Sequence, residues 1–440
     1  MIETVKNIFK IKDLRDRIFF TFFILMLERI GTKIVTPGIN SDVLASAMQD
    51  QSKLTGLYDL FTGGAFSQAA IFSCGIMPYI SASIILQLLG TAVPYFQRLQ
   101  KEGEEGRRRI TQYTRYGTLF IAGLQAFGIA IMLNGLTAPS GQSVSTGGFS
   151  FIVMTVITMS AGTMLIMWMG EQITDRGIGN GISLIIFIGI IAALPSSVNQ
   201  EFANIGGDQQ KVIYEFIAVL VMIAIIVVVV AMTQGTRKIP VQYAKRTIGK
   251  KVYGGTSSYF PLKVNSAGVM PIIFAQAFMT LPEFIFSVFP DNVFIQENLV
   301  PMFAYNHWVY WTVTFILIIF FTYFYTAIAM NPVEIADNLK KQNGFVPGIR
   351  PGKSTADYID AVLTRLTLPG SIFLGLISIV PYFLIESLEL SPRYANFFGG
   401  TGLLIIVGVA LDTLQQIESH LTMRNYDGFL KSGKLRGRRL

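Results

Sequence analysis

Residues that could carry acid–base chemistry are scarce within the apolar stretches of this 440-residue chain. Glu28 and Arg29 interrupt the first apolar stretch, while Glu171 and Asp412 stand near the ends of later ones. A charge near a helix end is readily solvated, whereas an enzyme or an ion-coupled transporter needs ionisable groups inside its membrane spans. The sequence therefore offers no set of side chains suited to proton transfer within a membrane.

Nucleophilic and metal-binding side chains are equally few. The two histidines, His307 and His420, fall outside the centres of the apolar stretches, so they supply no histidine relay or metal cluster. Cys74 is the lone cysteine, which excludes an intrachain disulfide and favours the role of a small buried apolar residue. No Ser/His/Asp or Cys/His set can be assembled. We predict a protein that is not an enzyme and uses no metal or cofactor.

Two glycine-containing stretches match phosphate loops in part. Residues 177–181 imitate part of a dinucleotide fingerprint, but they lie between two apolar stretches with no strand before them. Residues 107–109 are arginines after a turn that contains glycine, yet the G-x-x-x-x-G-K-[ST] motif is missing. A tight turn is the better interpretation of 177–181. The chain is predicted to be a passive conduit, so energy must come from a partner.

The elements that must position these residues are membrane-spanning helices. Apolar residues make up 51% of the chain, charged residues 14%, and the mean hydropathy is +0.51. Soluble domains carry about 25% charged residues, so this composition indicates an integral membrane protein. The ten predicted spans are 18–36, 75–92, 117–134, 151–170, 182–198, 212–232, 266–288, 308–330, 367–388 and 398–417.

Residues 63–90 form one apolar segment that is broken in two. The first part, 63–72, is rich in glycine, alanine and serine, and as a helix it would cover about 15 Å, half of the hydrocarbon thickness. The second part carries Ile80, Ile84 and Ile85 at helical spacing. Broken helices at membrane depth persist where protein or a watery cavity shelters them. The segment therefore predicts a path through the membrane.

Basic residues predict the orientation of the chain. Of the 35 Lys and Arg, the outer connections of this scheme hold Lys33, Lys53, Lys211 and Arg393. The positive-inside rule then places both termini in the cytoplasm, and an even number of spans agrees with this. No cleavable signal peptide is expected, because no small-x-small site follows the basic start.

The cytoplasmic positive charge gathers at 98–115, 237–263, 340–365 and in the tail from residue 431. Such residues act as topology signals and attract anionic lipid, at about 1 kcal/mol per residue near the surface. Two of these connections run to about 35 residues and are patterned with Gly, Pro and aromatic residues, which a topology signal does not need. A docking platform for acidic or RNA-containing partners is the second interpretation.

The ten spans divide into five plus five at the outer segment after the fifth span. An odd number per half makes the second half enter from the opposite side, so a repeat between the halves would be inverted. The expected organisation is an N-terminal half at 1–198, an external hinge at 199–211, a C-terminal half at 212–417 and a basic tail at 418–440.

A series of motifs extends in order over nearly the whole chain. They are 75–84 (GIMPYISASI), 101–103 (KEG), 106–108 (GRR), 112–117 (QYTRYG), 171–181 (EQITDRGIGNG), 243–246 (YAKR), 261–265 (PLKVN), 336–341 (ADNLKK), 344–352 (GFVPGIRPG) and 398–401 (FGGT). In this order they resemble the SecY family, the pore-forming subunits of preprotein translocases.

The resemblance implies an all-α integral membrane protein. Its ten transmembrane helices would form two five-helix inverted-repeat halves around a central pore, with a short plug half-helix in the outer funnel. The implied function is to pass unfolded secretory polypeptides across the bacterial cytoplasmic membrane and to release transmembrane segments laterally into it, driven by a partner motor or ribosome.

The resemblance also assigns a plug and a pore ring. The plug falls on 63–72, with the residues Gly63, Gly64, Ala65, Phe66, Ser67, Ala69 and Phe72. The ring candidates are Ile80 and Ile84 in span two, Ile186 and Ile190 in span five, Ile273 in span seven, and Leu403 and Ile405 in span ten. An apolar ring gates ions by dewetting and yields to a passing chain without selecting its sequence. Plain helix packing is the alternative for each of these residues.

A lateral gate is implied between spans two and three on one side and spans seven and eight on the other. Gln87 and Gln276 are polar residues within spans two and seven, and they are the candidates for this gate. Interhelical hydrogen bonds in lipid average about 0.6 kcal/mol, which suits a seam that opens. The alternative is that each amide bonds within its own half.

The long cytoplasmic loops are implied to dock the ribosome or the SecA motor. Arg350 is the first candidate, followed by Arg246 and Lys250, because arginine suits carboxylate and phosphate alike. SecE, SecG and anionic lipids are the other implied partners, and DNA is not one. Lipid exposure of Glu28 and Arg29 would be costly, so we expect them to pair or to face SecE or the channel interior.

Two rival functions fit parts of the sequence. A secondary transporter for a small solute would explain broken helices and an inverted repeat, but the shortage of intramembrane charges argues against it. A membrane scaffold without a conduit is the other rival. A disulfide locking 63–72 to span ten would leave protein export untouched if the chain were a scaffold.

Overall fold

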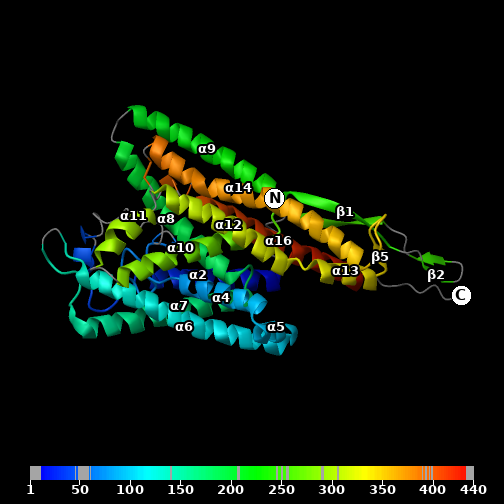
Figure 1. Cartoon of the computed structure of the whole chain (residues 1–440), viewed down its shortest axis with the longest axis horizontal. Helices are drawn as coiled ribbons and strands as arrows, with labels where there is room; N and C mark the ends of the chain where they lie inside the picture. The colour runs from blue at the N-terminus through cyan, green and yellow to red at the C-terminus, as the bar shows by residue number, and fades with distance from the viewer. Residues whose placement is uncertain are drawn as a thin grey trace. The chain divides into compact units, whose positions relative to one another are not determined.

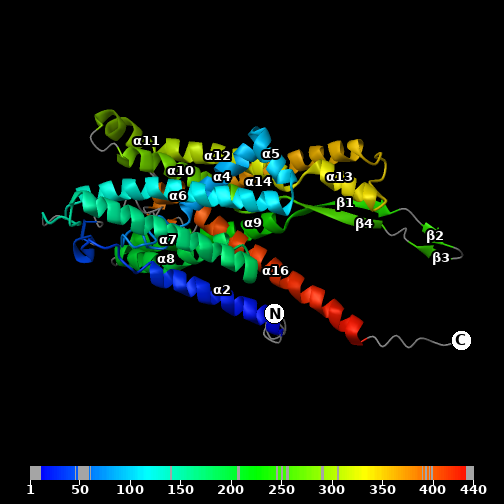
Figure 2. The same ribbon diagram turned by 90° about the horizontal axis from the view of Figure 1, so that it is seen from below.

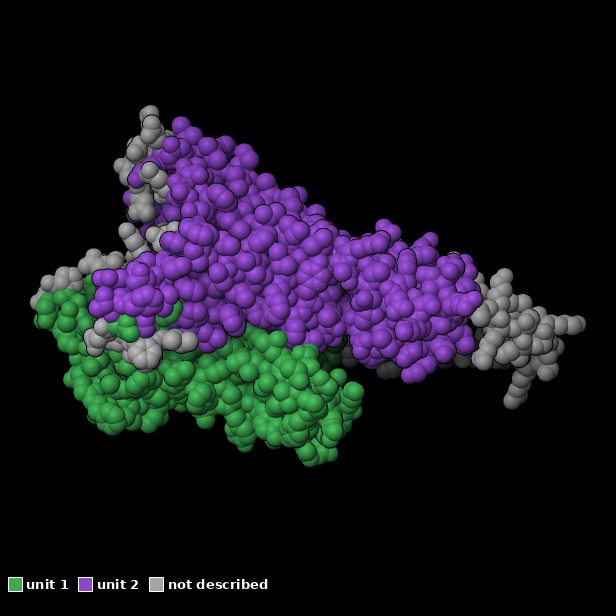
Figure 3. Space-filling view, in the orientation of Figure 1, with its two compact units in different colours: residues 1–197, 284–292, 408–440 green, residues 198–283, 293–407 purple. Residues whose placement is uncertain are grey.

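The protein is described by a computed structural model in which most of the chain is helical. The residues outside the described part are 1–10, 45, 48–58, 60, 139–140, 206–208, 244–245, 249–250, 254–256, 289–291, 305–306, 389, 392–393, 396, 398–399 and 433–440. The chain forms two compact units, coloured separately in Figure 3. Unit 1 comprises residues 1–197, 284–292 and 408–440, and unit 2 comprises residues 198–283 and 293–407.

Unit 1 is built from helices in the first part of the chain. They are α2 (Lys12–Gly31), α4 (Met77–Ala92), α5 (Pro94–Lys101), α6 (Glu104–Gly135), α7 (Gly148–Arg176) and most of α8 (Gly181–Ile205). Helix α6 packs along α4 and α7, and α2 contacts α7 (Figures 1 and 2). A Cβ at Gly117 of α6 would lie 3.3 Å from the Ala82 side chain of α4. Small residues therefore bring these helices close together, as is common among membrane helices.

The chain bends by 98° between α4 and α5. Val93 separates the two helices in an extended conformation, with φ −107° and ψ 122°, and Pro94 follows it. The proline ring clashes with a helical conformation of the preceding residue, so α4 has to end there. Helix α4 thus coincides with the predicted span 75–92 to within two residues.

Unit 2 contains the helices of the second part of the chain. They are α9 (Gln209–Gln234), most of α10 (Met270–Val288), the short η1 (Ile295–Leu299) and α11 (Val300–Met302), α12 (Trp308–Ala329), α13 (Pro332–Lys341), α14 (Lys353–Leu388) and the start of α16 (Gly400–Ser432). Helix α14 packs against α9, α12 and α13. Asn331 caps α13, because its side chain accepts hydrogen bonds from Val333 N and Glu334 N at 3.1 and 3.4 Å.

A small sheet is formed by two strands between α9 and α10 in sequence and one strand after α13. Its strands are β1 (Thr236–Tyr243), β4 (Ser257–Lys263) and β5 (Gly344–Phe345), while β2 (Arg246–Ile248) and β3 (Lys251–Tyr253) pair separately. Strand β1 is central: it pairs antiparallel with β4, placing Ile239 opposite Phe260, and antiparallel with β5, placing Gln242 opposite Phe345. The predicted all-α fold did not include this sheet.

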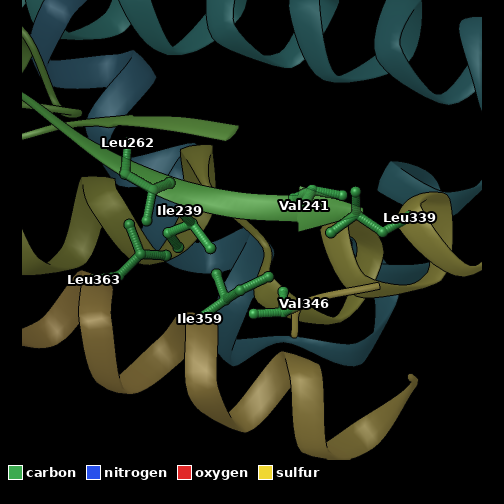
Figure 4. Close-up of a cluster of buried hydrophobic side chains, with 7 residues drawn as sticks. All are labelled: Ile239, Val241, Leu262, Leu339, Val346, Ile359 and Leu363. Atoms are coloured by element: carbon green, nitrogen blue, oxygen red, sulfur yellow. The ribbon is translucent and has the colours of Figure 1, made fainter. Parts of the chain in front are cut away.

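Seven buried side chains form the core that joins the sheet to α13 and α14 (Figure 4). They are Ile239, Val241 and Leu262 from the sheet, Leu339 from α13, Val346 just after β5, and Ile359 and Leu363 from α14. We call the sheet, α13 and residues 346–366 the platform. Its parts come from two stretches of the chain, 236–263 and 332–366, and apolar burial holds them together.

Seven helices of the described residues are long and apolar enough to cross a membrane, or eight if α4 and α5 together form one span. Helix α10 is shorter by this measure, with its apolar part at Met270–Pro282. Helix α2 overlaps the first predicted span. The count of ten spans stays a prediction.

The described residues of the predicted outer connection at 199–211 are helical, and its role as an external hinge stays a prediction. Helix α8 continues through Pro195 to Ile205, and α9 begins at Gln209. The hydroxyls of Ser196 and Ser197 both donate to Ala193 O at 2.9 Å. Pro195 lacks the N–H that would bond Ile191 O, and the helix continues past this missing bond.

Candidate functional site

Residues 62–76, which we call the turn segment, form consecutive turns, so the short helix predicted at 63–72 is wrong. Helical backbone is present at Phe61 and resumes at Met77. Four residues between them have positive φ: Gly63, Gly64, Ala69 and Gly75, at 62°, 86°, 44° and 55°. A right-handed helix requires negative φ, so these positions interrupt any helix across the segment.

Main-chain hydrogen bonds tie one end of the turn segment to the residues that follow α2. Thr36 N donates to Ala69 O at 3.0 Å, and Ile71 N donates to Ile34 O at 2.9 Å. These bonds flank an isolated antiparallel bridge between Val35 and Ala70. It fixes the position of residues 69–71 beside the end of α2.

Two glycines allow the turn segment to lie directly on helix backbones. A Cβ at Gly31 of α2 would lie 2.0 Å from the ring of Phe72. A Cβ at Gly162 of α7 would lie 2.1 Å from the carbonyl oxygen of Ile71. Neither separation is possible between real atoms, so glycine is required at both positions for this packing.

The turn segment also satisfies its own polar groups. The Ser73 hydroxyl, which is fully buried, lies 3.0 Å from Ala65 O and 2.7 Å from Ala70 O. Ser67 N donates to a carboxylate oxygen of Asp59 at 2.8 Å. Buried backbone carbonyls are costly without partners, so these bonds allow a non-helical segment to be buried.

Glu28 and Arg29 form an ion pair, as the sequence predicts. Arg29 Nε lies 2.6 Å from Glu28 Oε2, and Arg29 Nη2 lies 2.5 Å from Glu28 Oε1. A third nitrogen of Arg29, Nη1, donates to Gly63 O at 3.2 Å. The pair therefore connects α2 to the turn segment, a contact that the sequence did not predict.

The predicted plug residues all lie in the turn segment. Ala65, Phe66, Ala69 and Phe72 are buried, and Ser67 is half-buried. A Cβ at Gly64 would meet no atom within 4 Å. The structure thus brings the plug candidates together in one part of unit 1.

The ring candidates of unit 1 are buried in two pairs. Ile80 and Ile84 lie on α4, and Ile186 and Ile190 lie on α8. Members of each pair are four residues apart, so each pair occupies one face of its helix. This spacing fits both a pore-facing stripe and ordinary helix packing.

The ring candidates of unit 2 lie on two helices. Ile273 is on α10, Leu403 and Ile405 are on α16, and all three are buried. Residues two apart on an α-helix point about 200° away from each other. Leu403 and Ile405 therefore face different surroundings, and a single ring has room for one of them.

The two gate candidates bond within their own units. Gln87 Nε2 donates to Ser83 Oγ at 3.1 Å, one turn earlier on α4. Gln276, which is buried on α10, donates to Thr401 Oγ1 at 3.4 Å and accepts from the Tyr310 hydroxyl at 3.5 Å. The structure thus agrees with the alternative stated for Gln87 and Gln276, in which each amide bonds locally and not across a gate.

The glycine-rich stretch 177–181 is a structural turn. Ile178 N donates to Thr21 Oγ1 of α2 at 3.0 Å, and Gly179 N donates to Gln416 Oε1 of α16 at 3.0 Å. A phosphate loop needs free amide groups directed at its ligand. Because these amides already have protein acceptors, the prediction of a turn is confirmed.

Charged groups elsewhere in the helices pair locally. Glu171 of α7 and Arg115 of α6 make two contacts, at 2.7 and 3.2 Å, where both side chains are partly exposed. Among the residues that the structure describes, no group of three His, Cys, Asp or Glu side chains could hold a metal ion.

The first docking candidate, Arg350, is exposed on the turn between β5 and α14. Gly348 and Gly352 give this turn its shape, with φ of 82° and 101°. Thr355 Oγ1 of α14 donates to Arg350 O at 2.9 Å and fixes the backbone that carries the arginine. Of the other candidates, Arg246 lies on β2 and Lys250 lies outside the described residues.

The platform itself was missed by sequence reasoning. The signal that could have found it is the alternation of residues 238–243, in which Ile239 and Val241 are buried while Lys238 and Pro240 are exposed. The platform also carries further exposed basic residues, namely Arg237, Lys340, Lys341 and Lys353.

The family model and the sequence relatives identify the same protein family. The family model for SecY matches residues 70–414. The chain is 46% identical to the protein translocase subunit SecY of Streptomyces scabiei, over 98% of this chain and 100% of that protein. It is 42% identical to the protein translocase subunit SecY of Thermotoga maritima, over 100% of both chains.

Solved structures share the fold. A protein-conducting channel matches with a TM-score of 0.64 at 16% identity, covering 92% of this chain and 91% of that one. A SecY structure whose plug domain is described as stabilising the closed channel matches with a TM-score of 0.61 at 16% identity and the same coverage. Sec61 in the canine ribosome–channel complex matches with a TM-score of 0.59 at 15% identity, again with the same coverage. The predicted helical channel fold is confirmed.

Proposed function

Because the chain belongs to the SecY family, we propose that it is the protein-conducting channel subunit of a Sec translocase. It passes unfolded secretory polypeptides across a membrane and releases transmembrane segments laterally into it. The family match over nearly the whole chain carries this conclusion. The chain is a channel subunit and not an enzyme, so a partner supplies the energy.

In this channel the turn segment acts as the plug. Its contacts with α2 and α7 are made on glycine backbones, at Gly31 and Gly162. Its buried carbonyls find partners within the segment, such as the Ser73 hydroxyl. Bonds made inside the segment persist when part of it moves, so fewer buried groups lose their partners, which supports a displaceable plug.

The pore ring consists of Ile80, Ile84, Ile186, Ile190 and Ile273, completed by either Leu403 or Ile405. Burial of all these side chains supports a dry, apolar constriction. Such a constriction blocks ions by dewetting and accepts polypeptides of any sequence.

Gln87 and Gln276 belong to the lateral gate, between α4 and α6 on one side and α10 and α12 on the other. Each amide already bonds within its own unit. Opening a seam beside them would therefore leave neither amide unpaired in lipid, where an unsatisfied polar group is costly. This arrangement lowers the cost of opening.

The platform docks the motor SecA or a ribosome, with Arg350 as the principal contact and Arg246 and Lys250 assisting. Two structural neighbours, canine Sec61 and yeast Ssh1, are described as ribosome-bound complexes, which supports this assignment. SecE and SecG complete the channel, and anionic lipids meet the basic segments. The chain resides in the bacterial cytoplasmic membrane with ten spans and both termini in the cytoplasm.

The decisive experiment crosslinks a stalled secretory chain to photoreactive probes placed singly at Ile80, Ile190 and Ile405. A probe at Ile85, exposed on the same helix as Ile80, is the matched control. We expect crosslinks to the secretory chain at the three ring positions and little at Ile85. Equal crosslinking at all four positions, or none, would contradict the proposed pore.

A further inference from the structure

The Glu28–Arg29 pair has a geometry that simple charge neutralisation does not require. Consecutive side chains leave an α-helix about 100° apart, so they do not ordinarily face each other. Here the guanidinium of Arg29 turns back and contacts both carboxylate oxygens of Glu28, at 2.5 and 2.6 Å. A two-point contact fixes the plane of the guanidinium as well as its position. Glu28 therefore determines the direction of the remaining nitrogen, Nη1.

That remaining nitrogen donates to Gly63 O, 34 residues further along the chain, at 3.2 Å. The Glu28 side chain is 3% exposed and the Arg29 side chain 21% exposed, so water competes weakly for their hydrogen bonds. Gly63 is matched to this contact: a Cβ there would lie 2.2 Å from Nη1, and its φ is 62°. A side chain at 63 would be strained by this backbone conformation and would displace the Arg29 guanidinium.

The turn segment is thus held at two places by different chemistry. Near Ala69 it is held by main-chain pairing with the residues after α2, and Phe72 rests on Gly31. Near Gly63 it is held by one charged side chain. A side chain can swing away by rotation about its own bonds, whereas the main-chain pairing must break to release the segment. The end at Gly63 is therefore suited to release, and the end at Ala69 is suited to remain.

We propose that Glu28 and Arg29 form a latch on the turn segment. Glu28 is a positioning residue that directs Arg29 at Gly63, and this bond favours the closed position of the segment. Residues 69–72 act as the hinge. The inference rests on the proposed role of the turn segment as the plug. Loss of the latch shifts the ratio of displaced to seated segment by about ten-fold, the effect expected for a hydrogen bond to a charged group.

The test measures how readily a thiol reagent reaches the turn segment. The full-length chain is purified with its partner subunits and reconstituted into liposomes. Gln68→Cys, at a half-buried position of the segment, reports displacement through its rate of labelling by a maleimide. The native Cys74 is fully buried beyond the hinge and reports general loosening. Gln68→Cys is combined with Cys74→Ala so that each thiol is measured alone.

Glu28→Met and Arg29→Met should each raise the labelling rate at position 68 about ten-fold and leave Cys74 unlabelled. The double variant should raise it no further, because both changes remove the same bond. Arg29→Lys keeps the charge without the two-point contact, so it should behave like Arg29→Met. Asp16→Met, which removes an exposed carboxylate from the same helix, is the matched control and should change nothing.

Unchanged labelling in both single variants would overturn the latch. Additive effects in the double variant, or an equal rise at Cys74, would overturn it too, because either result indicates general destabilisation. Glu28→Gln, which keeps the size of the side chain, provides the same test if the methionine variants do not accumulate. Labelling requires no secretory substrate. A chain that showed the latch but carried no polypeptide would therefore contradict the channel function and leave the latch intact.

Discussion

The turn segment of unit 1 and the platform of unit 2 are both built around buried residues, but they are held in different ways. In the platform, large side chains from the sheet, α13 and α14 interlock in one core. In the turn segment, the partner surface is helix backbone exposed by Gly31 and Gly162. Interlocked side chains resist any displacement, whereas the turn segment is held at Gly63 by a single side chain that can rotate away. The platform is therefore the more rigid of the two regions, and the turn segment has one end suited to the displacement that we propose.

The largest expected effect is in the platform core. Ile359→Ala should destabilise the platform by about 2–5 kcal/mol, because it leaves a cavity where sheet and helix meet. Hydrogen exchange followed by mass spectrometry should show faster exchange in β1 and α13 and no change in the turn segment. Asp360→Ala, at the exposed neighbouring position, is the control. Equal exchange in the two variants would show that this core does not hold the platform together.

The next effect is on the seat of the turn segment. Gly31→Ala should destabilise the seated segment by about 1–3 kcal/mol, because the new methyl group would overlap the Phe72 ring. The amides of residues 69–73 should exchange faster, while the platform stays unchanged. Gly135→Ala places its methyl group in open space and is the control. If Gly31→Ala exchanged at the same rate as the control, glycine at position 31 would not be needed for Phe72 to pack on α2.

A smaller change of opposite sign is expected at Ala69. This residue has a φ of 44°, which strains a side chain, so Ala69→Gly should stabilise the seated segment by about 0.5 kcal/mol. Slower exchange at residues 69–71 would show it. Ala65→Gly, a buried position where the structure gives no positive φ, should act in the opposite direction. The strain argument fails if both variants speed exchange.

The smallest effect on stability is expected at Arg350. This side chain is exposed, so Arg350→Glu should change the free energy of unfolding by less than about 0.5 kcal/mol. It should nonetheless weaken translocation driven by the partner motor, while the chain still inserts into the membrane. Lys12→Glu, at an exposed position at the start of α2 and outside the platform, is the control. Translocation at the full rate in Arg350→Glu would remove this residue from the docking surface.

The spans were predictable because long apolar runs and proline boundaries leave few choices. Helix α4 ends before Pro94 for a reason visible in the sequence. The Glu28–Arg29 pairing was predictable on the same grounds, since lipid would penalise the isolated charges. The residues next to each other in the sequence were thus enough to predict the end of α4 and the Glu28–Arg29 ion pair.

The parts that were missed depend on residues far apart in the chain or on backbone strain. The apolar alternation of β1 is short, and its strand partner β5 lies near residue 344. The composition of 63–72 suggested a helix, but Ala69 gives no sign in the sequence of its positive φ. The contact of Arg29 with Gly63 was equally hidden, because no local pattern encodes which carbonyl a third nitrogen will meet.

The pairing of β1 with β5 has a consequence for the order in which the protein is made. Gln242 of β1 meets Phe345 of β5, and the helices α10 and α12 are synthesised between them. At about 5–20 residues per second, roughly 5–20 seconds of synthesis separate the two strands. An unfinished chain consequently holds a β1–β4 hairpin with an open edge and lacks the Arg350 turn. With the docking role proposed for Arg350, a nascent copy would not compete for docking partners until most of its own helices had been made.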